Sequence, residues 1–202
     1  RILGRKNSGN VQKILWCAEE LGLEFVREDY GGAFGKTRDP AFLALNPNGL
    51  VPVILEDGFA LWESNTILRY LAARQGKLLP GDARDRAKIE CWMDWQLTTL
   101  YPAIGPLFLA LVRGKPEEKS PEAIAPMLAR TTQAMRILSE HLAERRFVGG
   151  EAFSVADIAL GIFANRWFEL PIARIDLPPL EAWYRRLCER PGFRAHVMIG
   201  LS

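Results

Sequence analysis

The spacing of apolar residues changes once along the chain, and the change divides the sequence into two regions. Up to about residue 75, short apolar runs with strand character alternate with segments of helical spacing. After about residue 83, nearly all apolar residues recur at helical spacing. The pattern predicts an α/β domain of residues 1–76, a linker of residues 77–83 that contains Pro-Gly, and an all-helical domain of residues 84–202.

The first region is predicted to have the element order β-α-β-α-β-β-α. Strands are expected at residues 1–4, 25–30, 51–55 and 59–62, and helices at 11–21, 40–45 and 64–75. A helix between the first two strands allows them to lie parallel, whereas Glu56-Asp57-Gly58 favours an antiparallel hairpin between the last two. Gly22 and Gly76 are expected to end their helices as C-terminal caps.

The second region is predicted to be a bundle of helices. They are expected at residues 84–113, with a kink near Pro102 and Pro106, at 121–145, from 154 onward, at 178–189 and from 191 onward. Ser154-Val155-Ala156-Asp157 forms a capping box with Asp in place of Glu, and Phe153 and Ile158 occupy the hydrophobic staple positions. This segment is a folding signal and is not expected to take part in a reaction.

Composition narrows the class of protein. The 202 residues are 49% hydrophobic, which suffices for a substantial core. The 26 basic and 24 acidic side chains are mixed along the sequence, so a nucleic-acid partner is disfavoured. The longest apolar stretch, at residues 107–112, is far shorter than the ~20 residues that cross a bilayer, so no membrane span is expected. The chain begins on strand-like residues without a charged-then-apolar leader, and we expect a cytoplasmic protein.

The cysteine and histidine residues do not form a recognisable catalytic or metal-binding motif. Cys17, Cys91 and Cys188 lie far apart and form no CxxC pair, which indicates a reducing compartment and no metal site. Cys17 is expected to be a buried structural residue, with a nucleophilic role as the alternative. His141 and His196 have no candidate partner nearby in the sequence, so Ser-His or Cys-His catalysis is not supported.

Two neighbouring segments suggest a site for a small anionic peptide. Pro52 has no N–H and suits the first position of a strand, and the backbone of Val51 beside it could pair with an extended ligand. Ser64 lies near the first turn of the next helix, where unsatisfied N–H groups and the helix dipole favour an anion. Ser64 could instead serve only as the N-cap of that helix.

The arrangement of these features resembles the glutathione S-transferase family. The resemblance is carried by the β-α-β-α-β-β-α order, by Asn46-Pro47-Asn48-Gly49-Leu50-Val51-Pro52, by Glu63-Ser64 and by the all-helical second domain. Residues 5–13 resemble the start of the first helix in bacterial serine-type (theta-like) members, and residues 153–158 resemble the family's capping motif. The resemblance covers nearly the whole chain and implies a thioredoxin-like N-terminal domain followed by a helical domain.

The resemblance also implies how glutathione would be held. It implies a cis peptide before Pro52, pairing of the Val51 backbone with the cysteinyl residue, and contact of Glu63 and Ser64 with the γ-glutamyl end. In that arrangement the Ser64 hydroxyl and N–H bind the γ-glutamyl carboxylate. Lys36, or alternatively Arg38, is a candidate for the glycyl carboxylate, with an ordinary solvated loop charge as the other interpretation.

Ser8 takes the position of the family's catalytic serine, with Asn7 and Asn10 as neighbouring donors. A free thiol with a pKa near 8.5 is only about 3% thiolate at pH 7, so a hydroxyl that hydrogen-bonds the sulfur would raise the reactive fraction. The alternative is that Ser8 only caps the helix. Relatives of this type often have Ser-Ser-Asn where this chain has Ser-Gly-Asn, and Gly9 is expected to loosen the turn and remove a second hydroxyl.

For the electrophile, the resemblance implies a site between the domains, and Tyr101 and Phe108 are the candidates on the long helix. An aromatic stripe at helical spacing is also typical of core. Family membership further implies a homodimer, in which Asp94 could reach the partner's ligand, although a surface charge is the simpler interpretation. No metal is expected.

The predicted activity is conjugation of the glutathione thiolate to small hydrophobic electrophiles, with a role in detoxification. A glutathione-dependent reductase or lyase is an alternative that would need a cysteine where Ser8 stands. A non-catalytic glutathione-binding or assembly module is the other alternative, and Gly9 is its only hint in the sequence.

Overall fold

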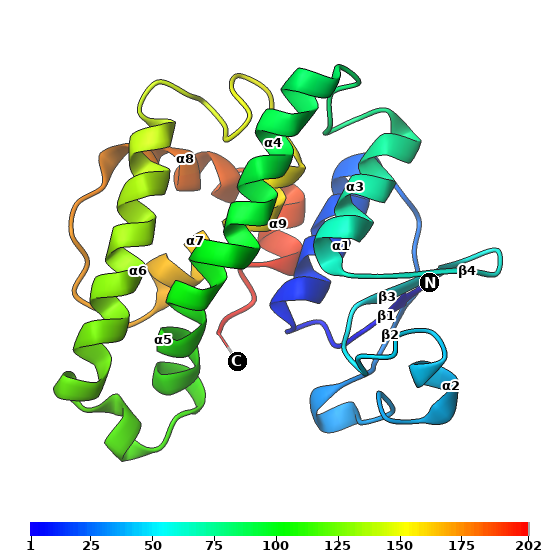
Figure 1. Cartoon of the computed structure of the whole chain (residues 1–202), viewed down its shortest axis with the longest axis horizontal. Coiled ribbons are helices and arrows are strands. Elements are labelled where there is room, and N and C mark those ends of the chain that lie inside the picture. The colour runs from blue at the N-terminus through cyan, green and yellow to red at the C-terminus, as the bar shows by residue number, and fades with distance from the viewer. Residues whose placement is uncertain (202) are drawn as a thin grey trace.

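A computed structural model of the chain describes residues 1–201 and divides into a sheet-containing part and a helical part (Figure 1). The first part contains β1 (Ile2–Leu3), α1 (Gly9–Leu21), β2 (Arg27–Glu28), the 3-10 helix η1 (Gly32–Phe34), α2 (Pro40–Leu43), β3 (Val53–Glu56), β4 (Phe59–Trp62) and α3 (Ser64–Gln75). The helical part contains α4 (Ala83–Trp95), the π-helical turn η2 (Gln96–Leu100), α5 (Tyr101–Arg113), η3 (Pro116–Lys119), α6 (Pro121–Leu142), α7 (Val155–Glu169), α8 (Pro178–Cys188) and α9 (Pro191–His196). The predicted fold class is confirmed.

The four strands form one sheet in the order β2-β1-β3-β4. β1 pairs parallel with β2, whereas the β1–β3 and β3–β4 pairs are antiparallel, as the crossover helix and the hairpin signal predicted. The first two strands are shorter than predicted, at two residues each. The ladder of β3 begins at Val53, so the backbone of Val51 lies outside the sheet.

Two apolar layers cover the sheet. A small cluster of Leu3, Phe42 and Val53 joins one face to α2. On the other face, a much larger cluster runs from Ile2 and Ile54 through α1 and α3 into the helical part without interruption. The two parts therefore share one hydrophobic core.

Helix α1 lies at the centre of this shared core, between α3 on one side and α7 and α9 on the other (Figure 1). Ten of its 13 residues are buried, so the helix is covered nearly all round. Trp16 is fully buried, and a Cβ on Gly192 of α9 would lie 2.7 Å from its ring. The glycine lets α9 approach the indole closely enough to fix the helical part against α1.

The long helical stretch is continuous over the predicted range and contains a π-helical turn that was not predicted. α4, η2 and α5 follow one another without a break from Ala83 to Arg113, and a π-helical turn precedes Pro102. This adjustment accommodates a proline that cannot donate a backbone hydrogen bond. By length and composition alone the stretch could cross a membrane, but part of it is buried in the protein, as in the core helix of a soluble protein.

Candidate active site

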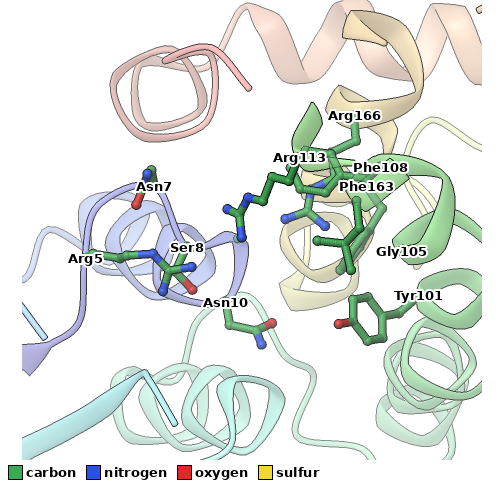
Figure 2. A pocket seen from close by; sticks show the side chains of 12 residues that line it. Arg5, Asn7, Ser8, Asn10, Tyr101, Gly105, Phe108, Arg113, Phe163 and Arg166 are labelled. Atoms are coloured by element: carbon green, nitrogen blue, oxygen red, sulfur yellow. The ribbon is translucent and has the colours of Figure 1, made fainter. Parts of the chain in front are cut away.

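A cavity of about 160 Å³ separates the start of α1 from helices α5 and α7. Ser8, Asn7 and Asn10 line it on one side, and Tyr101 and Phe108 line it on the other. Figure 2 shows these two groups of side chains facing each other across the cavity. The structure thus brings together all three residues predicted to act on the thiol and both residues predicted for the electrophile.

Ser8 is the N-cap residue of α1, but its side chain makes no capping hydrogen bond. The first intrahelical bond of α1 runs from the N–H of Gln12 to the carbonyl of Ser8, so the N–H groups of residues 9–11 have no intrahelical acceptor. A sulfur placed beside Ser8 would meet a hydroxyl that does not bond its own helix. It would also lie at the positive end of a 13-residue helix.

The structure shows a close contact at Gly9 that the sequence did not indicate. It is buried as the first residue of α1, and a Cβ built on it would lie 2.7 Å from Nη2 of Arg166 and 3.1 Å from Ile162. The expectation that Gly9 loosens the turn stays a prediction. The glycine provides the space in which the Arg166 guanidinium packs against α1.

The second predicted part of the site lies at the start of α3. Val51–Pro52 is the cis peptide bond that the family resemblance implied. Glu63, not Ser64, is the N-cap residue of α3, and its backbone has a φ of 68°, which is uncommon for a residue with a side chain. The alternative that Ser64 is the N-cap is wrong, because Ser64 is already the first helical residue.

Ser64 is buried and belongs to a hydrogen-bond chain that reaches the cavity. Its hydroxyl donates to Oδ1 of Asn10 over 3.2 Å and accepts from Nζ of Lys13 over 3.3 Å. Asn10 therefore links the thiol side of the site to the start of α3. The bond to Oδ1 leaves the Asn10 amide N–H groups as donors.

Lys13 was not identified from the sequence, and it is the most unusual charged residue of the site. It is fully buried, and its Nζ donates to Asn65 Oδ1 over 3.0 Å and to Gln96 Oε1 over 2.8 Å in addition to Ser64. Burial and, to a lesser extent, the nearby Arg166 lower the pKa of Lys13 to about 7, and Glu63 acts in the opposite direction. The sequence did contain a signal, because a lysine beside the apolar run Ile14-Leu15-Trp16-Cys17-Ala18 lies in a helix that is buried all round.

Three arginines that the sequence analysis also missed line the cavity. They are Arg5, Arg113 and Arg166, contributed by the loop before α1, by α5 and by α7. The guanidinium of Arg166 stacks on the ring of Phe108 with 4.1 Å between Cζ and the ring centroid. Burial lowers the pKa of Arg166 to about 10, which is still far above neutral pH, so the cavity carries positive charge.

Other predicted residues lie away from the cavity. Lys36 is exposed, and its Nζ lies 5.1 Å from the centroid of the Tyr30 ring, so its contact with a glycyl carboxylate stays a prediction. Asp94 forms an ion pair with Arg69 of α3. Cys17 is fully buried and burial raises its pKa, which agrees with a structural role. Among residues 1–201, no group of three or more His, Cys, Asp or Glu side chains could hold a metal ion.

Comparison with known proteins identifies relatives along the whole chain. Residues 7–74 match the family described as glutathione S-transferase, N-terminal domain, and residues 121–186 match the corresponding C-terminal domain. The chain is 40% identical over 205 residues to glutathione S-transferase GstB of Escherichia coli, covering 100% of this chain and 99% of that protein. It is also 31% identical to the disulfide-bond oxidoreductase YfcG of Escherichia coli, over 91% of this chain and 87% of the relative.

Solved structures agree with these relatives. The crystal structure of the theta class glutathione S-transferase from Xanthomonas axonopodis pv. citri with glutathione bound superimposes with a TM-score of 0.94. Its sequence is 42% identical, and the match covers 100% of this chain and 98% of that chain.

Proposed function

The chain belongs to the glutathione S-transferase family, and from that premise we propose that it conjugates the thiolate of glutathione to small electrophiles in the cavity between its two parts. The observation that supports this most directly is the position of Ser8. Its hydroxyl makes no capping bond and lies at the N-terminus of α1 beside a cavity with an aromatic opposite wall. The close structural similarity to a glutathione-bound relative, with a TM-score of 0.94, supports the same proposal.

In this proposal Ser8 donates a hydrogen bond to the glutathione sulfur, and Asn7 and Asn10 are nearby donors. Lowering the thiol pKa by about two units requires ~2.7 kcal/mol of differential stabilisation. A hydrogen bond to a charged group supplies ~1.5 to 3 kcal/mol and a helix N-terminus ~0.3 to 1 kcal/mol, so the two together are sufficient. The thiolate then attacks the electrophile held against Tyr101 and Phe108, and the main contributions to the rate are thiolate stabilisation and proximity.

The rest of glutathione would lie along β3 and the start of α3. The backbone of Val51 is outside the sheet ladder and can pair with the cysteinyl residue, beside cis Pro52. The backbone N–H groups at the start of α3 can receive the γ-glutamyl carboxylate, since its first intrahelical bond is donated by Ile67. Ser64 would add its hydroxyl by turning from Asn10 to the ligand, with Glu63 beside it and Lys36 near the glycyl end.

The proposal includes a cytoplasmic homodimer that acts in detoxification, without a metal, a nucleic-acid partner or a membrane. Glutathione is the co-substrate, and the division into residues 1–76, 77–83 and 84–202 assigns glutathione binding to the first part. The end of α3 at Gln75 and the start of α4 at Ala83 support that division.

Replacing Ser8 with Ala tests the proposal. Turnover of 1-chloro-2,4-dinitrobenzene is expected to fall by roughly tenfold or more, because the thiol pKa in the glutathione complex rises by about one to two units. Glutathione affinity should stay within a few fold. The measurements are kcat, the dissociation constant of glutathione, and the ultraviolet absorbance of the bound thiolate as a function of pH.

Ser120→Ala is the matched control, since Ser120 is also an N-cap residue and accepts from the N–H of Ala123 at the start of α6. A structural Ser8 would lower Tm as Ser120→Ala does and leave the thiol pKa unchanged, which would refute its proposed role. Ser64→Ala should reduce the rise in Tm that glutathione produces. An unchanged rise would refute the role of the Ser64 hydroxyl.

The similarity to a disulfide-bond oxidoreductase favours one second candidate function, glutathione-dependent disulfide reduction. Here the activated thiolate attacks a disulfide, a second glutathione completes the exchange, and oxidised glutathione leaves with two substrate thiols. Cys17 would not take part, because it is buried and its pKa is raised. Turnover of 2-hydroxyethyl disulfide that exceeds turnover of aryl halides would establish this candidate over the first.

A further inference from the structure

The cavity beside Ser8 carries more positive charge than a site for apolar electrophiles needs. Arg5, Arg113 and Arg166 are three of its twelve lining residues, and none of the twelve is Asp or Glu. Figure 2 shows the guanidinium groups of Arg113 and Arg166 reaching in from the helical part toward the start of α1. Cations that lie close together repel one another and raise the free energy of the empty site.

Arg166 stacks on two aromatic rings. Its Cζ lies 4.1 Å from the centroid of the Phe108 ring and 5.2 Å from that of Phe163. Within residues 1–201 its guanidinium forms no hydrogen bond or ion pair, and neither does that of Arg5. Stacking fixes the plane of a guanidinium and leaves its N–H edge free to bind a planar anion.

The close approach of Arg166 to α1 depends on Gly9. A side chain at this position would collide with Nη2 of Arg166, from which a Cβ would be only 2.7 Å away. Arg166 is therefore fitted to the cavity from both sides, by two rings behind it and by a glycine in front. Burial and the charge of Arg113 also lower the pKa values of Arg5 and Arg166, although Tyr101 acts in the opposite direction on Arg166.

Glutathione already has partners for its own carboxylates in the proposed arrangement, at the start of α3 and in the loop of Lys36. We therefore propose that the acceptor substrate is itself an anion, whose carboxylate Arg166 and Arg5 bind while Tyr101 and Phe108 contact its apolar portion. This inference rests on the proposed function and names the substrate class of that same site. It replaces the expectation of a purely hydrophobic electrophile with an amphipathic one.

The reaction is a substitution that needs no further reactant. The glutathione thiolate attacks the carbon that bears a halide, a C–S bond forms, and the halide leaves with the electron pair of the broken bond. The thiol proton has already passed to solvent when the thiolate forms. The arginines bind the distant carboxylate and undergo no chemical change.

A matched pair of aryl halides tests the proposal. 4-Chloro-3-nitrobenzoate and 4-chloro-3-nitrobenzamide have the same leaving group and nearly the same shape, and they differ in charge. Each kcat/KM is divided by the rate constant of the uncatalysed reaction of the same compound with glutathione. We expect this normalised value to be about tenfold or more higher for the benzoate than for the benzamide. Raising NaCl from about 0.05 M to about 0.5 M should lower this ratio severalfold, because salt screens the attraction.

Two substitutions locate the effect. Arg166→Gln and Arg5→Gln should each reduce the benzoate-to-benzamide ratio by about tenfold, whatever happens to the absolute rates. Arg185→Gln is the matched control, because Arg185 lies on the exposed surface of α8 in an ion pair with Glu181, and it should leave the ratio unchanged. The salt dependence of the unmodified protein provides a test that does not depend on either variant folding.

The outcomes separate this inference from the proposed function. Glutathione binding with turnover of 1-chloro-2,4-dinitrobenzene, but a ratio near one that salt does not change, would overturn the anionic acceptor alone. An equal loss of glutathione affinity and of both aryl halide rates in the variants would assign the arginines to glutathione and also overturn it. If no aryl halide reacts, the proposed function fails. The anion site can still be tested by measuring equilibrium binding of the benzoate and the benzamide to protein saturated with S-methylglutathione, and equal affinities would show that the site does not exist.

Discussion

Two fully buried ionisable side chains, Asp157 and Lys13, are held in opposite ways. The Asp157 carboxylate accepts from the N–H groups of Val148 and Ser154 at 2.8 Å each, from the Ser154 hydroxyl at 2.9 Å and from Trp183 Nε1 at 2.8 Å. All of these donors belong to the helical part. Lys13 instead donates to three neutral oxygens, which come from α3 and from η2 and so from both parts.

The two arrangements affect the pKa values of Asp157 and Lys13 differently. Burial raises the pKa of Asp157, but the four hydrogen bonds act in the opposite direction and satisfy the carboxylate within one domain. Among residues 1–201 no carboxylate forms a hydrogen bond or ion pair with Lys13, and burial is the main cause that lowers its pKa to about 7. Lys13 therefore has a pKa near neutral pH.

The largest expected effect is the loss of the Asp157 carboxylate. Asp157→Ala should lower the free energy of unfolding by about 3 to 5 kcal/mol, because several buried donors are left without an acceptor. Chemical denaturation at neutral pH measures this difference. Asp157→Asn is the control that retains one accepting oxygen, and it should cost less than Ala; a cost below about 1 kcal/mol for Ala would show that the network is not structural.

The next effect is the contribution of Lys13 to the pH dependence of the free energy of unfolding. Below pH 7 both the folded and the unfolded chain hold the lysine proton, whereas between about 7 and 10.5 only the unfolded chain holds it. The free energy of unfolding should therefore rise with pH in this window, by up to about 1.4 kcal/mol per unit from this group. Lys13→Met should remove this contribution in denaturation experiments from pH 6 to 10, and parallel curves for the two proteins would contradict the low pKa.

A smaller effect is expected when a carboxylate is placed beside Lys13. Gln96→Glu keeps the oxygen that accepts from Lys13 and adds a negative charge beside it. The pKa of Lys13 should rise by about one unit or more. The increase in the free energy of unfolding between pH 7 and 9 should then be smaller by roughly 1.4 kcal/mol. A slope identical to that of the unmodified protein would mean that neutral surroundings do not cause the shift.

Features encoded in a few consecutive residues were predictable. The capping box at Ser154 and Asp157, the αL cap at Gly22 and the hairpin around Gly58 depend on local backbone chemistry, and the structure contains all three. The family resemblance added the cis bond before Pro52. Residues 1–4 and 25–30 gave strands shorter than predicted, because apolar pattern alone does not determine where a ladder ends.

The positions of Ser8, Asn10, Tyr101 and Phe108 on one cavity agree with the sequence-based interpretation, since each lies next to a recognisable motif or helix. The alternative of Ser64 as an N-cap failed because the N-cap is the preceding residue, Glu63, with its unusual backbone. The contact of Gly9 with Arg166 could not be predicted from local pattern, because Arg166 is a neighbour only in space.

Local periodicity, turn chemistry and short motifs were enough to predict the order of elements, the division into two regions and the family. The charge of the site, in contrast, depends on contacts made in three dimensions. Lys13 meets its partners 51 to 83 residues further along the chain, and Arg166 reaches Gly9 from the opposite domain. Burial and Coulomb interactions depend on distance in space, so no pattern along the chain could show that these cations are buried close to one another.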